Sequence, residues 1–162
     1  MKSMVVYDSL YGNTEQIAQK IASSLGSQED VGVLRAGEVK PEQLAGVKLL
    51  VVGGPTQRLR ATEAIYNFLN RIPKNGLKGV RVAAFDTRLT MSEIEKRPPL
   101  PFFHRIFGYA AGRIAPGLKK KGGKLVVPPE GFYVEGMKGP LVQGELERAE
   151  SWARQISATI AP

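Results

Sequence analysis

Short, uninterrupted apolar runs alternate along the chain with stretches in which apolar residues recur every three or four positions. The first run, residues 3–7, predicts a buried strand. The spacing of Ile17 and Ile21 after it predicts a helix over residues 13–25, which Gly26 ends. Because a run without polar alternation is typical of a strand covered on both faces, the chain begins as a strand–helix unit suited to a parallel sheet.

The same alternation continues through the sequence. Further strands are predicted at residues 31–37, 47–54, 80–86 and 124–127, and the last of them resumes at residues 132–136. Helices are predicted at residues 62–72, 103–115 and 144–160, with Pro116 ending or kinking the second. Residues 40–46 have room for one helical turn, and the prolines of residues 95–103 exclude regular structure.

Five buried strands joined by crossovers predict an α/β fold. We expect one domain over residues 1–162, a doubly wound five-stranded parallel sheet with helices on both faces. Two common strand orders fit this count. In both of them ligands bind beyond the carboxyl ends of the strands, so the loops at those ends are the candidates for a functional site.

The loop after the first strand, DSLYGNT, offers hydroxyls and a glycine but no cation. Ser9 and Thr14 supply the hydroxyls, and Gly12 allows close approach of the backbone. Asn13 is placed to cap the helix, with Gln16 three residues later in a capping-box pattern. The N–H groups of such a loop point at one spot at a helix N-terminus, which suits a phosphate. An ordinary capped turn is the alternative.

Two more polar loops follow neighbouring predicted strands. GGPTQRLRAT follows the third strand and FDTRLTM includes the end of the fourth. The side chains that they expose are those of Thr56, Gln57, Arg58, Asp86, Thr87 and Arg88. Because carboxyl ends of parallel strands meet at one edge, the three loops together predict a cleft. A Gly-Lys-Ser/Thr triphosphate loop and a dinucleotide glycine pattern are both missing from the sequence.

At YDSLYGNTEQIAQKIA, LLVVGGPTQ, VAAFDTR and FYVEGMKGPLVQGELERAESWA the chain resembles the flavodoxins and flavodoxin-like FMN proteins. The resemblance implies the strand order 2-1-3-4-5, bound FMN, electron transfer, and no side chain acting as acid or base. It implies that the phosphate is bound by Ser9, Tyr11, Gly12, Asn13 and Thr14, with Leu10 in the same loop. It implies that the flavin ring is flanked by Pro55, Thr56, Gln57, Arg58, Leu59, Asp86, Thr87 and Arg88.

The chain departs from this family in two ways. Typical flavodoxins hold the ring between aromatic side chains of the second and third loops, which here contain none. Stacking then comes from guanidinium planes, from elsewhere in the chain, or not at all. Phe102 and Phe103 are candidates for it, and the alternative is that they anchor the following helix in the core. Typical flavodoxins are also acidic, whereas Arg58 and Arg88 here are expected to favour the reduced, anionic flavin.

Composition excludes several kinds of site. The 162 residues include no cysteine and one histidine, His104, so disulfides, thiol catalysis and a histidine-rich metal site are excluded and no metal is expected. No run of eighteen apolar residues is present, and the apolar stretch at the N-terminus is too short for a signal peptide. We therefore expect a cytoplasmic protein that does not insert into a membrane.

The formal net charge of +8 leaves several interpretations open. It fits a solvated surface, a phosphate-bearing ligand, nucleic acid or an acidic protein partner. No aromatic residues interleave with the dense basic stretches LKKKGGK and QRLR, which argues against nucleic acid. We expect an acidic redox partner. The alternatives are an FMN-dependent NAD(P)H or quinone reductase, and a binding module with weak or no FMN binding.

Overall fold

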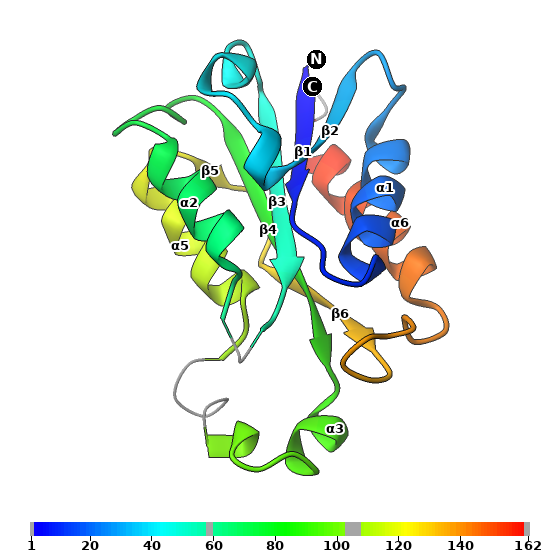
Figure 1. Ribbon diagram of the computed structural model, residues 1–162. Coiled ribbons are helices and arrows are strands. Elements are labelled where there is room, and N and C mark those ends of the chain that lie inside the picture. Colours follow the sequence, from blue (N-terminus) through cyan, green and yellow to red (C-terminus); the bar gives the residue numbers. More distant parts are fainter. Residues whose placement is uncertain (1, 58–59, 103–107, 161–162) are drawn as a thin grey trace.

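The computed structural model describes residues 2–57, 60–102 and 108–160 (Figure 1). The strands form one parallel sheet in the order β2-β1-β3-β4-β5, with β6 also paired to β4, which confirms the predicted fold class and strand order. The strands are β1 (Ser3–Tyr7), β2 (Val31–Arg35), β3 (Leu49–Pro55), β4 (Arg81–Leu89), β5 (Lys124–Leu125) and β6 (Glu130–Val134).

The last two strands share one position in the sheet. β5 pairs with the first residues of β4, and β6 pairs with its last five, from Phe85 to Leu89. Pro128 and Pro129 lie between β5 and β6, and since proline has no N–H to donate, the ladder is interrupted there. The predicted resumption of the fifth strand is therefore confirmed.

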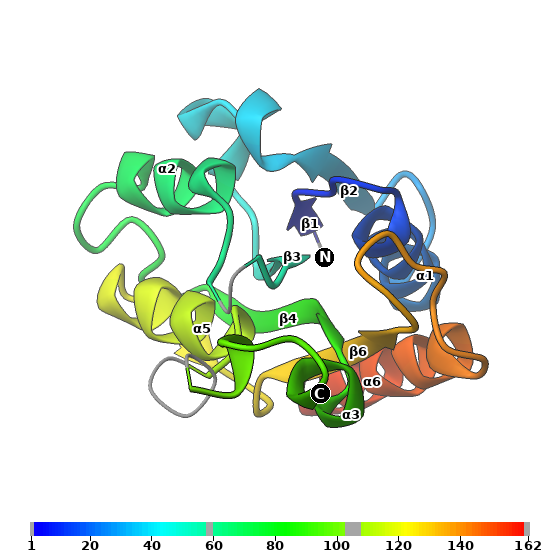
Figure 2. The ribbon, with the colours of Figure 1, turned by 60° about the horizontal axis from the view of Figure 1, so that its bottom comes forward.

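Two pairs of helices cover the two faces of the sheet (Figures 1 and 2). α1 and α6 lie together on one face and α2 and α5 on the other. The helices of the described residues are α1 (Asn13–Leu25), α2 (Glu63–Arg71), α3 (Met91–Glu95), α5 (Ala111–Lys120) and α6 (Glu145–Ile160), with 3₁₀ turns at Ala36–Glu38 and Pro41–Leu44.

Alternate residues of the central strands pack into two separate cores, one on each face of the sheet. In β3, Leu50 and Val52 pack with the α2 and α5 side, whereas Leu49 and Val51 pack with the α1 and α6 side. The second core contains three aromatic rings, those of Phe85, Phe132 and Trp152, which meet edge to face at centroid distances of 6.0–6.2 Å. These cores fix where the carboxyl ends of the strands lie.

The structure corrects two expectations about the segment after β4. Residues 100–102 are helical despite the neighbouring prolines, because Pro101 falls in a first turn, where a missing N–H removes no helical bond. The predicted helix 103–115 is confirmed over residues 111–115, but α5 begins only at Ala111 and continues to Lys120, so Pro116 does not end it. The carbonyl that Pro116 leaves unpaired belongs to Gly112, which is exposed to water. Residues 103–107 lie outside the described residues.

A buried carboxylate joins the start of α6 to β6. Glu145 accepts hydrogen bonds from the Tyr133 N–H at 2.7 Å and from Arg148 Nε at 2.9 Å. Burial alone would raise the pKa of Glu145, but the hydrogen bonds from Arg148 and Tyr133 outweigh it and lower the pKa below its usual value. The folded protein therefore holds this carboxylate in its charged form.

This lowered pKa predicts an acid-labile fold. The unfolded chain takes up the Glu145 proton near pH 4.3, before the folded protein does, so stability is lost as pH falls through the lower folded-state pKa. Replacing Glu145 by Gln should lower the free energy of unfolding at pH 7 by about 1–2 kcal/mol and flatten its decline below pH 5. Urea unfolding at several pH values measures both. Glu147→Gln, at an exposed position of α6, is the control, and parallel pH curves for wild type and Glu145→Gln would contradict the account.

Candidate functional site

A cavity opens at the carboxyl ends of β1, β3 and β4. It contains about 860 Å³ of empty space, including its open mouth. It brings together most of the residues predicted from the sequence, namely Ser9, Leu10, Tyr11, Asn13, Thr14, Pro55, Thr56, Gln57, Thr87 and Arg88. The three loops predicted to form a cleft do form one.

The remaining predicted residues lie elsewhere. Gly12 borders a shallow surface between α1 and α6. Asp86 is fully buried and is linked to the cavity through Arg88 and Thr56. Arg58 and Leu59 lie outside the described residues.

α1 begins at Asn13, one residue earlier than it would if Asn13 were the cap. Gly12 occupies the position before the helix with a φ of 90°, a conformation that glycine adopts without strain, and Asn13 is already helical. The Ser9 hydroxyl accepts hydrogen bonds from the N–H groups of Gly12 (3.1 Å) and Glu15 (3.3 Å). The Asn13 side chain instead donates to the Lys138 carbonyl at 3.1 Å, so the prediction that Asn13 caps the helix is wrong.

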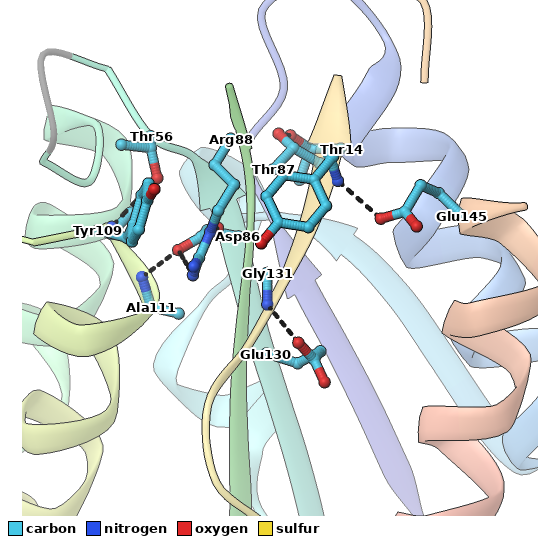
Figure 3. Close-up of polar contacts among 12 residues, drawn as sticks. Thr14, Thr56, Asp86, Thr87, Arg88, Tyr109, Ala111, Glu130, Gly131 and Glu145 are labelled. Atoms are coloured by element: carbon cyan, nitrogen blue, oxygen red, sulfur yellow. Dashed lines mark hydrogen bonds and ion pairs between the residues drawn. The ribbon is translucent and has the colours of Figure 1, made fainter. Parts of the chain in front are cut away.

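Two buried hydroxyls line the floor of the cavity. Thr14 Oγ1 and Thr87 Oγ1 lie 2.7 Å apart and share a hydrogen bond that joins the first loop to β4 (Figure 3). Each hydroxyl carries one proton and two lone pairs, so one of them keeps a free donor. Among the hydrogen bonds of the described residues, none uses the N–H groups of Asn13 and Thr14 in the first turn of α1. The arrangement offers an anion several uncharged donors.

A buried ion pair forms the opposite wall. Arg88 Nε and Nη2 donate to the two carboxylate oxygens of Asp86 at 2.6 and 2.8 Å, with side-chain exposed fractions of 16% for Arg88 and 0% for Asp86. The Ala111 N–H, at the start of α5, adds a third hydrogen bond at 2.8 Å (Figure 3). Burial raises the pKa of Asp86, and the hydrogen bonds from Arg88, Ala111 and Thr56 oppose that rise.

Arg88 is held in place on both sides. Its guanidinium carbon lies 3.7 Å from the ring centroid of Tyr109, and on the other side the chain passes at Gly131 (Figure 3). Because Asp86 compensates its charge, Arg88 presents a neutral, stacked pair to the cavity rather than a free cation. This removes most of the electrostatic effect that we expected from Arg88 on a nearby flavin.

Gly131 is required for this packing. A Cβ at that position would lie 2.0 Å from Arg88 Nε. We therefore expect Gly131→Ala to push Arg88 off Asp86 and to lower the free energy of unfolding by about 1–2 kcal/mol. Gly112→Ala, at an exposed helical position with open space around its Cβ, is the matched control and should be neutral or stabilising. Equal urea midpoints for Gly131→Ala and wild type would contradict the packing argument.

Sequence reasoning missed the apolar part of the lining. The additional residues that line the cavity are Leu89, Ile94, Leu100, Tyr109, Val134 and Met137. Several of them come from the segment after β4, which includes α3 and lies beside the cavity. The only sequence signal for this placement is the apolar spacing of that segment. Tyr109 supplies an aromatic wall, whereas Phe102 is half-exposed and does not line the cavity. Phe103 lies outside the described residues.

Two features are absent from the part of the chain that the structure describes. There, no group of three His, Cys, Asp or Glu side chains could hold a metal ion. There, too, no helix has the length and apolar character needed to cross a membrane.

The sequence over residues 4–123 matches the model of a family described as the flavodoxin domain. No curated protein matches the sequence.

Many solved structures share the fold. An oxidised flavodoxin 2 from Bacillus cereus superposes with a TM-score of 0.75 at 18% identity, covering 99% of this chain and 100% of that one. A flavodoxin from the domain Archaea gives 0.75 at 21% identity, covering 98% and 97%. A flavodoxin from Streptococcus pneumoniae TIGR4 gives 0.74 at 18% identity, covering 99% and 100%. At these identities the likeness concerns the fold.

Proposed function

Because the chain belongs to the flavodoxin family, we propose that it binds FMN in the cavity beyond β1, β3 and β4 and carries electrons. The observation that carries the proposal is the first loop, which gathers hydroxyls and unused N–H groups at the start of α1 without a cation. This donor set fits a phosphate monoester held at a helix N-terminus. When bound, FMN supplies the redox chemistry.

The rest of the cavity fits the flavin ring. Its lining is largely apolar, and Tyr11 and Tyr109 add aromatic surface to it. Arg88, stacked on Tyr109 and paired with Asp86, offers a flat and uncharged wall. These residues would position the ring and exclude water from part of it.

Among the described residues that line the cavity, no side chain is arranged to act as an acid or base. Asp86 is the buried carboxylate nearest the cavity, and its oxygens are already occupied by Arg88 and Ala111. These residues therefore bind and orient a cofactor rather than carry out acid–base chemistry of their own.

The net charge supports an acidic redox partner. At +8, the chain attracts a negatively charged protein over a distance that salt shortens to about 8 Å at 0.15 M. We expect the rate of electron transfer to an acidic partner to fall as salt rises, because long-range attraction speeds encounter. A stopped-flow series measures this rate. An uncharged small-molecule acceptor is the control, and a rate with the partner that is flat or rising would contradict the proposal.

The visible absorption spectrum tests the proposed function. The protein, as purified or after addition of FMN, should show flavin bands that remain after gel filtration. Direct reduction of the bound flavin by NADPH would instead indicate a reductase. A colourless protein that ignores added FMN would leave a binding module and contradict the proposal.

A further inference from the structure

Cations gather at the end of the sheet opposite the cavity. Lys48 precedes β3, Arg81 begins β4 and Lys124 begins β5. Hydrogen bonds join their strands in one row: Arg81 N donates to the Lys48 carbonyl and Lys124 N to the Val80 carbonyl, both at 2.9 Å. Lys48 N in turn donates to the Lys2 carbonyl at 2.9 Å. The row follows the amino ends of the strands, at the top of Figure 1.

Two turns extend this row. The turn after α2 and the turn after α5 pack together, since Leu77 N donates to the Lys121 carbonyl at 2.9 Å. The lysines of these turns therefore lie beside the strand ends that carry the other cations. We call the whole cluster the basic end, formed by Lys2, Lys48, Lys74, Lys78, Arg81, Lys119, Lys120, Lys121 and Lys124.

Acidic side chains are missing from the segments that build most of the basic end, and the exceptions at this end of the sheet are Glu29 and Asp30, which precede β2 beside Lys2. Residues 43–62, 64–85 and 96–129 contain no Asp or Glu. Among the ion pairs of the described residues, none involves a cation of the basic end, and most of these cations are exposed. Because like charges held together repel one another, a surface that served only solubility would mix both signs.

We propose that the basic end adsorbs to the surface of an anionic phospholipid bilayer, by charge and without insertion. A cluster of four to eight Lys or Arg residues is enough for such binding. The exposed large apolar side chains among the described residues are Leu10, Tyr11, Met91, Phe102 and Met137. These lie in the loops and short helices that follow the carboxyl ends of the strands, so the basic end offers charge alone.

The position of the basic end argues against two other partners. A redox protein docked there would lie at the far end of the strands from the cavity, where electron transfer is slowest, so the overall charge speeds the encounter with an acidic partner but the docking surface for that partner lies elsewhere. Nucleic acid is disfavoured because the basic end has no aromatic side chain for stacking and presents turns rather than a helix or strand ribbon to a groove. Adsorption to a bilayer requires neither, and it leaves the cavity facing away from the membrane.

The test is co-sedimentation of the full chain with vesicles at about 0.15 M salt. Binding to mixed phosphatidylcholine–phosphatidylglycerol vesicles, but not to pure phosphatidylcholine vesicles, is expected. The triple variant Lys119→Gln, Lys120→Gln, Lys124→Gln should bind the anionic vesicles more weakly, on the order of a hundredfold. The matched control removes the same charge elsewhere, by Lys20→Gln, Lys96→Gln and Arg154→Gln, and should retain most of the binding.

Three outcomes would overturn the proposal. The first is that wild type does not bind anionic vesicles, and the second is that both triple variants lose binding equally. The third is that a DNA duplex displaces the protein from the vesicles at a lower concentration than added phosphatidylglycerol vesicles do. FMN titration of both variants separates this proposal from the function proposed above, because the basic end lies away from the cavity. Unchanged FMN binding with lost vesicle binding is the expected combination.

Discussion

Replacing Asp86 by Asn is expected to lower the free energy of unfolding by about 3–5 kcal/mol, the usual effect of removing one partner of a buried ion pair. The neutral amide leaves the guanidinium of Arg88 without its counter-charge at a side chain only 16% exposed. The Ala111 N–H loses a charged acceptor at the same time. Since β4 and α5 are both joined through this carboxylate, the loss should appear as a lower urea midpoint for the whole chain.

A double-mutant cycle gives this prediction its control. Asp86→Asn, Arg88→Gln and the double variant are each unfolded in urea, and the loss in the double variant should be clearly smaller than the sum of the single losses. Additive losses would mean that the two side chains do not act as a pair. Glu95→Gln, which removes an exposed carboxylate of α3, should change the stability little.

Replacing Thr14 by Val is expected to weaken FMN binding by about 1–3 kcal/mol, or roughly 5- to 150-fold, as for a lost hydrogen bond to a charged group. The valine keeps the shape of the side chain but removes the hydroxyl from the floor of the cavity. Because Thr14 is buried in α1 below the first loop, the loss is expected in affinity for the phosphate rather than for the ring. Fluorescence titration measures the dissociation constant.

Thr87→Val is the matched control for this change. It breaks the same hydroxyl pair from the other side, since the two oxygens are partners at 2.7 Å. Thr87 lies in β4, beside the region where we place the flavin ring, so its replacement should affect FMN and riboflavin to the same extent. Thr14→Val should weaken FMN selectively. Identical effects of the two variants on the FMN-to-riboflavin ratio would contradict the assignment of Thr14 to the phosphate.

Regular patterns made most of the fold predictable from the sequence. The apolar run Leu49–Val52 alternates between two cores, and such runs, separated by helical spacing, are enough to indicate a parallel sheet. The loops that line the cavity could also be predicted, because they follow strand ends directly. Thr14 and Thr87 were expected at one edge, and they meet there.

The missed features depend on contacts that local sequence does not encode. Asn13 has the residue type of a helix cap, but its side chain donates a hydrogen bond to the carbonyl of Lys138, far along the chain. The Ser9 hydroxyl instead accepts hydrogen bonds from N–H groups at the start of the helix. The charge of Arg88 was visible, whereas its compensation by Asp86 requires both side chains to turn to the same side of β4. Tyr109 enters the cavity from a segment whose path only tertiary packing decides.

The central claim is that the first loop holds the phosphate of FMN with uncharged donors. Its most direct test is a pair of titrations of the wild-type protein, one with FMN and one with riboflavin, which lacks the phosphate. We predict that FMN binds at least about tenfold more tightly, because each hydrogen bond to a charged group contributes about 1.5–3 kcal/mol. Equal affinity for the two flavins, or no binding of either, would contradict the account.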